Sequence, residues 1–219
     1  MKAIPARRLL ADRAYDALKG SLQSGAYPPG SFLSERQLAR SLGMSKTPLK
    51  SALVRLEAEG FIKISPQQGI VVREPSVQEV LELFDLREAI ETFAVGRIAG
   101  RLTAGQIAAL RRNIREQAAA VKAANVAEST RLDTEFHTML SGLLGNRELS
   151  QILTRMREKL HILILGNLTR LPERMAGSYR EHAAIAAAVI RGDGPGASEL
   201  VRKHLDFGRH LILGAGQKN

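Results

Sequence analysis

Hydrophobic residues recur at helical spacing along most of the chain, and one short stretch follows a different pattern. Apolar positions in Arg7–Ser24 repeat every three or four residues and Gly25 ends the run, which predicts a first helix. Two shorter helices are predicted within residues 34–60. After them, the β-rich runs 61–64 and 70–72 flank turn-forming residues, so we expect a β-hairpin.

The two short helices have recognisable ends. Ser34 is a good N-cap and Gln37 can reach back to it, a capping box that starts the first helix at the next residue. Gly43 can adopt the positive φ that a helix end often requires. Ser45 can cap the second helix, in which Pro48 lies in the first turn, where its missing N–H removes no intrahelical hydrogen bond. The pattern predicts two helices joined by a tight turn.

The second short helix has an apolar face and a polar N-terminal end. Leu49, Leu53 and Leu56 line the face that is expected to be buried. In a helix-turn-helix the N-terminal end of this helix reaches DNA base edges, and a following hairpin forms the wing. We expect Arg36 to contact phosphate and Gly69, at the wing tip, to approach the minor groove. The predicted DNA-contacting residues are Arg36, Ser45, Lys46, Thr47, Lys50 and Gly69.

Three motifs in this part match a known pattern: SERQLA at 34–39, GMSKTPLKSAL at 43–53 and RLEAEGF at 55–61. Residues Arg7–Arg73 thereby resemble the DNA-binding head of the GntR family of bacterial transcription regulators. The resemblance implies a short edge strand in the region of the turn 27–30. The family usually has Arg where this chain has Lys46 and Lys50. Because Arg binds guanine or phosphate with two parallel hydrogen bonds and Lys acts as a point charge, the operator preference of relatives is not carried over.

The second part of the chain is predicted to be helical throughout. A polar linker at 73–76, which includes Pro75, ends the hairpin and marks the expected domain boundary. Beyond it, Thr103 can cap the second of several amphipathic helices, and the absence of strand patterns predicts an all-α bundle. The predicted fold is mainly α, with a winged helix-turn-helix domain at 1–74 and a helical domain at 77–219. The six expected helices are 77–100, 103–121, 127–144, 149–168, 175–191 and 197–213.

Charge and composition narrow the possible functions. The net charge is +10, and +6 of it falls in residues 1–75, so the smaller part has the denser positive charge. Such a part suits a polyanion, although excess charge is also common on ordinary solvated surfaces. The sequence has no cysteine, which excludes disulfides and thiol chemistry. We find neither the apolar run of a signal peptide nor the ~20 apolar residues of a membrane span, so we expect a cytoplasmic protein.

Four polar residues occupy positions that should face the interior of the bundle. Asp133 and His137 are four residues apart, so they share one face of a helix in a row with leucines. His182 and His204 lie in register with apolar residues of the last two predicted helices. Each could be an ordinary hydrogen-bonded core residue. Together, one Asp and three His could instead ligate a divalent transition metal, and the spacing alone leaves both readings open.

Five motifs of this part match a second known pattern: LREAIE at 86–91, Asp133 with Phe136 and His137, Gly145-Asn146, Glu181-His182 with Ile185, and His204-Leu205. Nearly all of residues 76–219 thereby resembles the FCD ligand-binding domain of the FadR subgroup. Metal-binding members use an Asp and a His four apart on one helix and two further His, which implies a metal site at Asp133, His137, His182 and His204. We expect Zn²⁺ or Ni²⁺. His161 and His210 match no motif, and solvent exposure is expected for His210 because it lies about 120° from His204 around the helix.

The resemblance also implies a small organic acid effector. In relatives, the metal and nearby basic side chains hold such an acid, and Arg87 matches an inward-facing Arg of the pattern. A guanidinium could pair with the acid through two hydrogen bonds. The alternative is a pair within the helix between Arg87 and Glu91, which are four residues apart.

These inferences predict a metabolite-responsive transcription regulator, a repressor that binds a pseudo-palindromic operator as a homodimer. One alternative is a metal sensor, in which the ion itself is the signal. A metal-dependent enzyme is another, but no motif supplies a base or nucleophile, and Glu135 and Glu181, beside predicted ligands, are expected to point elsewhere. An architectural DNA-binding protein would not need the buried polar residues. The sequence does not identify the effector, the metal or the target genes.

Overall fold

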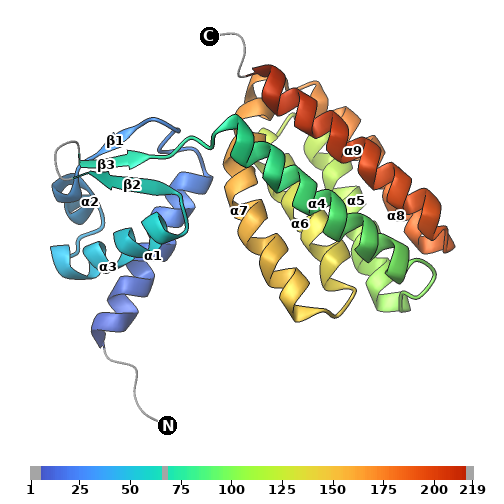
Figure 1. The fold of residues 1–219 in the computed structure, drawn as a ribbon, viewed down its shortest axis with the longest axis horizontal. Coiled ribbons are helices and arrows are strands. Elements are labelled where there is room, and N and C mark those ends of the chain that lie inside the picture. Colours follow the sequence, from blue (N-terminus) through green and yellow to red (C-terminus); the bar gives the residue numbers. More distant parts are fainter. Residues whose placement is uncertain (1–5, 66–68, 216–219) are drawn as a thin grey trace. The chain divides into compact units, whose positions relative to one another are not determined.

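The chain divides into two compact units, Met1–Pro75 and Ser76–Asn219. A computed structural model describes residues 6–65 and 69–215 (Figure 1). The division falls inside the polar linker 73–76. Among the described residues, every helix is too short or too polar to cross a membrane.

The first unit is a winged helix-turn-helix, as predicted. Its strands form one antiparallel sheet in the order β1-β3-β2, in which Phe32 is opposite Val71 and Ile62 is opposite Val72. β1 is the edge strand that the resemblance implied. The turn of the predicted hairpin, at 66–68, lies outside the described residues. The elements are α1 (Ala6–Gln23), β1 (Phe32–Leu33), α2 (Glu35–Ser41), α3 (Lys46–Ala58), β2 (Ile62–Ser65) and β3 (Gly69–Val72).

The core of the first unit lies between α1 and α3, which pack against each other. The predicted apolar face of α3 is buried there, against apolar residues of α1. Because this face is buried, the polar side of the first turns of α3 remains at the surface. The buried residues of the two helices include Ala14, Leu18, Leu22, Leu49, Ala52, Leu53 and Leu56.

The two short helices begin where predicted, but the predicted side-chain caps are wrong. Ser34 and Ser45 occupy the N-cap positions with extended backbone, and neither side chain accepts a cap hydrogen bond. At α3, Pro48 occupies the third helical position and has no N–H, which removes one of the two backbone donors that an N-cap hydroxyl can use. At α2 the capping box with Gln37 does not form, and the N–H of Leu38 donates to the backbone oxygen of Ser34 at 3.0 Å.

The second unit is a bundle in which the described residues form only helices, again as predicted (Figure 1). Thr103 caps α5 in a reciprocal pair with Gln106, and Ser76 caps α4 in the same way with Glu79. α4 packs along α9, and α6 packs along α7. The helices are α4 (Val77–Ile98), α5 (Ala104–Lys122), α6 (Val126–Gly142), α7 (Arg147–Arg170), α8 (Arg174–Arg191) and α9 (Gly194–Ala215).

The last helix begins three residues earlier than predicted. Gly194-Pro195 was expected to separate α8 from α9, but Pro195 is the second residue of α9, where a missing N–H costs no intrahelical bond. Asp193 accepts the backbone N–H of Gly196 at 2.9 Å and thus caps the helix. Gly194 packs against the end of α4, where an added Cβ would lie 3.1 Å from the backbone oxygen of Gly96.

Candidate metal centre and DNA-contacting helix

The four predicted metal ligands converge inside the second unit. Asp133 and His137 come from α6, His182 from α8 and His204 from α9, and all four are buried. Nε2 of His204 lies 3.1 Å from Nε2 of His137 and 3.3 Å from Nε2 of His182. Oδ1 of Asp133 lies 3.5 Å from Nε2 of His182 and 3.9 Å from Nε2 of His137.

Each of the three imidazoles is oriented by a hydrogen bond at Nδ1, the ring nitrogen that faces away from the other histidines. Carboxylate and amide oxygens accept hydrogen bonds, so every Nδ1 is the donor, and in a neutral imidazole Nε2 then carries the lone pair. Hydrogen bonds of this kind orient metal-bound histidines in proteins and raise their basicity. The three pairs are His137 Nδ1 to Glu91 Oε2 at 2.6 Å, His204 Nδ1 to Glu181 Oε2 at 2.7 Å, and His182 Nδ1 to Gln117 Oε1 at 2.9 Å.

Two of the three histidines, His137 and His182, are held in the neutral form that binds metal. Burial, followed by the charge of Arg157, lowers the pKa of His137 to about 3. Burial, followed by the neighbouring His204 and His137, holds the pKa of His182 well below its usual value. Neutral imidazole is the ligand form, because a proton on Nε2 would compete with the ion.

The spacing of these atoms fits a divalent transition metal. Ligand atoms at metal–nitrogen distances of about 2.0–2.1 Å are separated from one another by roughly 3.0–3.4 Å. The Nε2 separations of 3.1 and 3.3 Å agree with this range, and the Asp133 oxygen lies slightly outside it.

One prediction about the surroundings of the ligands is wrong. Glu181 was expected to point away, but it accepts from His204 and is also paired with Arg174, whose two Nη atoms lie 2.8 and 2.5 Å from its carboxylate. Glu181 is half-buried and faces His204 on α9. Burial raises the pKa of Glu181, but the hydrogen bonds and charges of His204 and Arg174 outweigh it and lower the pKa to about 2. Glu135 behaves as expected and pairs with Arg131 at the surface, at 2.8 Å.

Sequence reasoning also missed a buried ionic cluster beside the candidate metal centre. Oε1 of Glu91 lies 2.8 Å from Nε of Arg87 and 3.2 Å from Nη2 of Arg157, and Nη1 of Arg157 lies 3.6 Å from Oδ2 of Asp133. Burial alone would raise the pKa of Glu91, but Arg87, His137 and Arg157 outweigh it and hold the pKa well below its usual value. Burial, followed by the charge of Arg87, lowers the pKa of Arg157 to about 10.

Arg87 therefore forms the intrahelical pair that was the alternative to effector binding. The pair with Glu91 uses Nε of the Arg87 guanidinium and not its Nη2. Nη2 of Arg87 is buried and makes no hydrogen bond with any group among residues 6–65 and 69–215. Arg87, Asp133 and His204 all line a cavity whose empty volume of about 470 Å³ includes space that is open to solvent. The cavity thus adjoins the candidate metal centre and contains a donor that has no acceptor among the described residues.

The two remaining histidines lie outside this cluster. His210 is exposed, with 75% of its side chain accessible, as predicted. His161 is partly buried, and its Nδ1 lies 3.0 Å from Oγ1 of Thr134.

The predicted DNA-contacting residues lie at the surface of the first unit. Ser45, Lys46, Thr47 and Lys50 are exposed at the N-terminal end of α3, and Arg36 is exposed at the start of α2. None of the three cations forms an ion pair with a residue that the structure describes. They are therefore available to an external anion.

Gly69 has a structural reason to be glycine. Its φ is +82°, and a Cβ there would lie 3.3 Å from the backbone oxygen of Leu33 in the neighbouring strand. The predicted approach of Gly69 to the minor groove remains a prediction, and a substitution at this position would also strain the sheet.

Comparisons with known proteins agree with both motif patterns. Residues 10–72 match the model of bacterial regulatory proteins of the gntR family, and residues 82–207 match the FCD domain. The chain is 34% identical to the Nta operon transcriptional regulator of Aminobacter aminovorans over 86% of this chain and 90% of that protein. It is 24% identical to the transcriptional repressor RspR of Escherichia coli (strain K12) over 87% of this chain and 83% of that protein.

The fold agrees with these matches. The solved structure of E. coli McbR/YncC superimposes with a TM-score of 0.82 at 20% identity, covering 95% of this chain and 99% of that one. A winged helix-turn-helix with an exposed basic end, followed by a helical bundle, is the arrangement of a regulator and not of an enzyme. The chain belongs to the GntR family and is a DNA-binding transcription regulator with an FCD domain.

Proposed function

We propose that this regulator is a metabolite-responsive repressor whose helical domain binds a divalent transition metal, Zn²⁺ or Ni²⁺, and a small organic acid. Asp133, His137, His182 and His204 would hold the ion. The observation that carries the proposal is the convergence of three imidazoles on one point, where the Nδ1 of each ring donates to an acceptor on another helix. A bound ion would supply positive charge at the wall of the adjoining cavity.

The charges around the centre support an anionic effector. Three guanidiniums lie within or beside the cluster, and three carboxylates balance them, so the surroundings are neutral before an ion binds. A divalent ion would add two positive charges that these side chains do not compensate, and a carboxylate entering the cavity would offset part of that charge. The six groups are Arg87, Arg157, Arg174, Glu91, Asp133 and Glu181.

A homodimer is supported by an apolar surface on the helical domain. Leu86 and Phe93, seven residues apart on α4, are 48% and 52% exposed, and Ile152 on the neighbouring α7 is 37% exposed. Large apolar side chains on one face suit a second copy of the same surface. Two heads in a symmetric dimer would read two half-sites, which is why we propose a pseudo-palindromic operator, in the cytoplasm, as the target.

Elemental analysis of protein purified without chelator tests the metal site. We expect about one equivalent of a divalent transition metal per chain, and a higher thermal stability with the metal than without it. His182→Ala should lose the metal, whereas His210→Ala, which removes an exposed imidazole, should keep it. If the wild type contains no metal and cannot be reloaded, the four residues are a buried hydrogen-bond network and the metal proposal is wrong.

Operator binding tests the regulation. We expect the metal-loaded protein to bind DNA from the region next to its gene, and we expect an organic acid to release the protein from this DNA. The acid can do so only if it binds the DNA-free conformation of the protein more tightly than the DNA-bound conformation. Operator affinity that follows the metal and ignores every organic acid would favour the metal sensor.

A further inference from the structure

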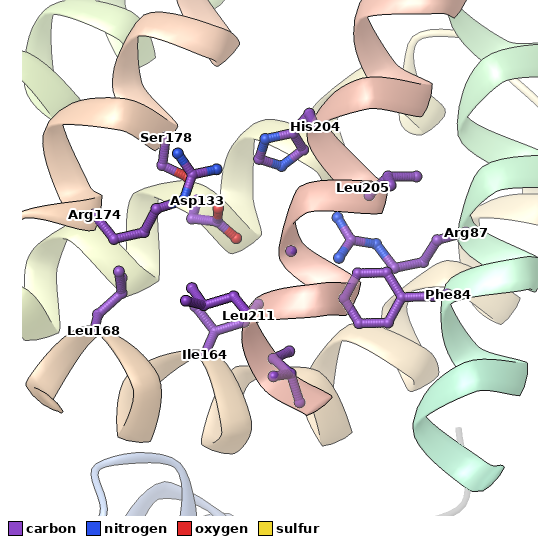
Figure 2. A pocket seen from close by; sticks show the side chains of 12 residues that line it. Phe84, Arg87, Asp133, Ile164, Leu168, Arg174, Ser178, His204, Leu205 and Leu211 are labelled. Atoms are coloured by element: carbon purple, nitrogen blue, oxygen red, sulfur yellow. The ribbon is translucent and has the colours of Figure 1, made fainter. Parts of the chain in front are cut away.

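The cavity beside the metal centre has two chemically different ends (Figure 2). In Figure 2, Asp133, Ser178 and His204 lie along one side, and Ile164, Leu168 and Leu211 lie across from them. The groups near the metal centre are polar: Arg87, Asp133, Arg174, Ser178 and His204. The rest of the lining has no side-chain hydrogen-bonding group: Phe84, Ile164, Leu168, Leu205, Leu211 and Ile212, with Gly208.

The polar end offers few free donors. The guanidinium of Arg87 is oriented by its bond from Nε to Glu91 at 2.8 Å, which leaves Nη2 buried without an acceptor among the described residues. Arg174 also lines the cavity, but both of its Nη atoms are paired with Glu181, and its guanidinium lies 4.1 Å from the ring centre of Phe207. A buried donor without a partner is costly, so Nη2 of Arg87 favours a ligand that brings one acceptor group to this end.

The apolar end disfavours a second charged group. A carboxylate placed against Ile164, Leu168 and Leu211 would lose part of its hydration and gain no hydrogen bond from these side chains. An alkyl chain or an aromatic ring at the same place would bury apolar surface on both sides.

We propose that the effector is a monocarboxylic acid with an apolar body, aliphatic or aromatic, and not a di- or tricarboxylic acid. Its carboxylate contacts Nη2 of Arg87 at the metal end, and its body lies against Ile164, Leu168 and Leu211. This inference rests on the proposed function, because it specifies the acid that the same site takes.

Gly208 determines how much space the apolar part of the ligand has in the cavity. A Cβ added at Gly208 would lie 3.4 Å from Cε1 of Phe84, so any larger side chain would extend over the ring and into the cavity. The absence of a side chain at 208 therefore leaves space for the apolar part of the ligand.

Hexanoate and adipate form a matched pair that tests the inference, because they have the same number of carbons and differ in whether the far end is a methyl or a carboxylate. Isothermal titration calorimetry and thermal shift are measured on the full chain loaded with Zn²⁺. We expect hexanoate to bind about tenfold or more tightly than adipate and to raise the melting temperature further. 4-Methylbenzoate and terephthalate provide an aromatic pair with the same contrast.

Leu211→Arg should reverse the preference. Leu211 is only partly buried, so the chain can accommodate an Arg there, and the new guanidinium gives the second carboxylate a partner. Adipate should then bind more tightly than hexanoate. His210→Arg is the matched control, since it adds the same side chain one residue away at an exposed position, and it should leave both affinities unchanged.

The outcomes separate this inference from the proposed function. If wild-type protein binds adipate as well as hexanoate, the inference is wrong, while a regulator of polar organic acids still stands. If neither member of either pair binds and operator DNA responds to the metal alone, both the monocarboxylate inference and the organic acid proposal fail.

Discussion

The buried charge of Glu91 gives a direct test of how the centre of the helical domain is held together. Glu91 is almost completely inaccessible, and its carboxylate contacts three groups that are also buried: Nε of Arg87 at 2.8 Å, Nη2 of Arg157 at 3.2 Å and Nδ1 of His137 at 2.6 Å. Glu91→Gln keeps the shape of the side chain and an oxygen that can accept from His137. It removes the negative charge that two guanidiniums share.

The expected loss is large on the scale of protein stability. Charges about 4 Å apart interact with about 4 kcal/mol at an effective dielectric constant of about 20, and the substitution removes two such attractions while the two guanidiniums continue to repel each other. Measured effects of removing one partner from a buried ion pair are about 3–5 kcal/mol, and we expect Glu91→Gln to fall in this range. That is a substantial part of the roughly 5–15 kcal/mol by which most domains are stable.

Glu88→Gln on the same helix is the matched control. Glu88 pairs with Nε of Arg202 at 3.2 Å and with Nη2 of Arg209 at 3.7 Å, but its side chain is 34% exposed. Surface pairs of this kind contribute about 1 kcal/mol or less, so this variant should lose little stability.

Urea unfolding of the metal-free full chain, followed by the loss of helical circular dichroism, measures both variants. The free energies of unfolding are compared for the transition of the helical domain. The comparison requires that the slope of this free energy against urea concentration is similar in the wild type and the variants. If Glu91→Gln loses no more than Glu88→Gln, Glu91 does not compensate the buried guanidiniums, and the account of this cluster is wrong.

Three further predictions concern the head and the metal site. If the lysine side chain contacts a base, Lys46→Ala or Lys50→Ala should weaken binding to the operator by roughly 1–3 kcal/mol and binding to random DNA by less. Equal losses on the two DNAs in a binding titration would show that the lysine contacts phosphate instead. Arg36→Ala should weaken binding to all sequences alike and reduce the salt slope by about one, whereas an unchanged slope would contradict a phosphate contact. Gln117→Leu should lower metal affinity about 10–100-fold because Nδ1 of His182 loses its acceptor, and competition with a chelator that shows unchanged affinity would contradict this.

The helices and the inward placement of four polar residues could be predicted because both depend on local spacing, whereas their assignment as metal ligands came from the resemblance. Asp133 and His137 are four residues apart, and one helical turn brings them to the same face whatever else surrounds them. His182 and His204 each interrupt an apolar row, so burial of the row carries the imidazole inward. The structure places all four ligand atoms within 4.8 Å of one another, and metal binding itself stays a prediction.

The helix ends were predicted less well because caps depend on the exact backbone around each donor. Ser45 is at the predicted N-cap, yet Pro48 removes the N–H that its hydroxyl would accept. Pro195 was read as a break, but the same missing N–H makes it compatible with the first turn of α9. In both cases the position of the proline within the first turn matters more than the residue type.

The groups that orient the histidines could not be found from spacing, because they come from distant parts of the chain. Glu91 is 46 residues from His137, and Gln117 is 65 residues from His182, so only the packing of different helices brings each pair together. Periodicity assigns a residue to a face of its own helix and does not identify the residue opposite it.

Arg157 shows where one further step of physical reasoning would have helped. It lies four residues after Leu153 and three before Leu160, both fully buried, so it occupies an apolar row of α7 just as the histidines do in their helices. A guanidinium in such a row cannot lose its charge, so it requires a carboxylate from another helix. Glu91, which follows Arg87 by one turn on α4, satisfies that requirement at 3.2 Å. Searching apolar rows for any charged residue, and then demanding a partner for each, would have extended the prediction from the metal ligands to the ionic cluster that lies beside them.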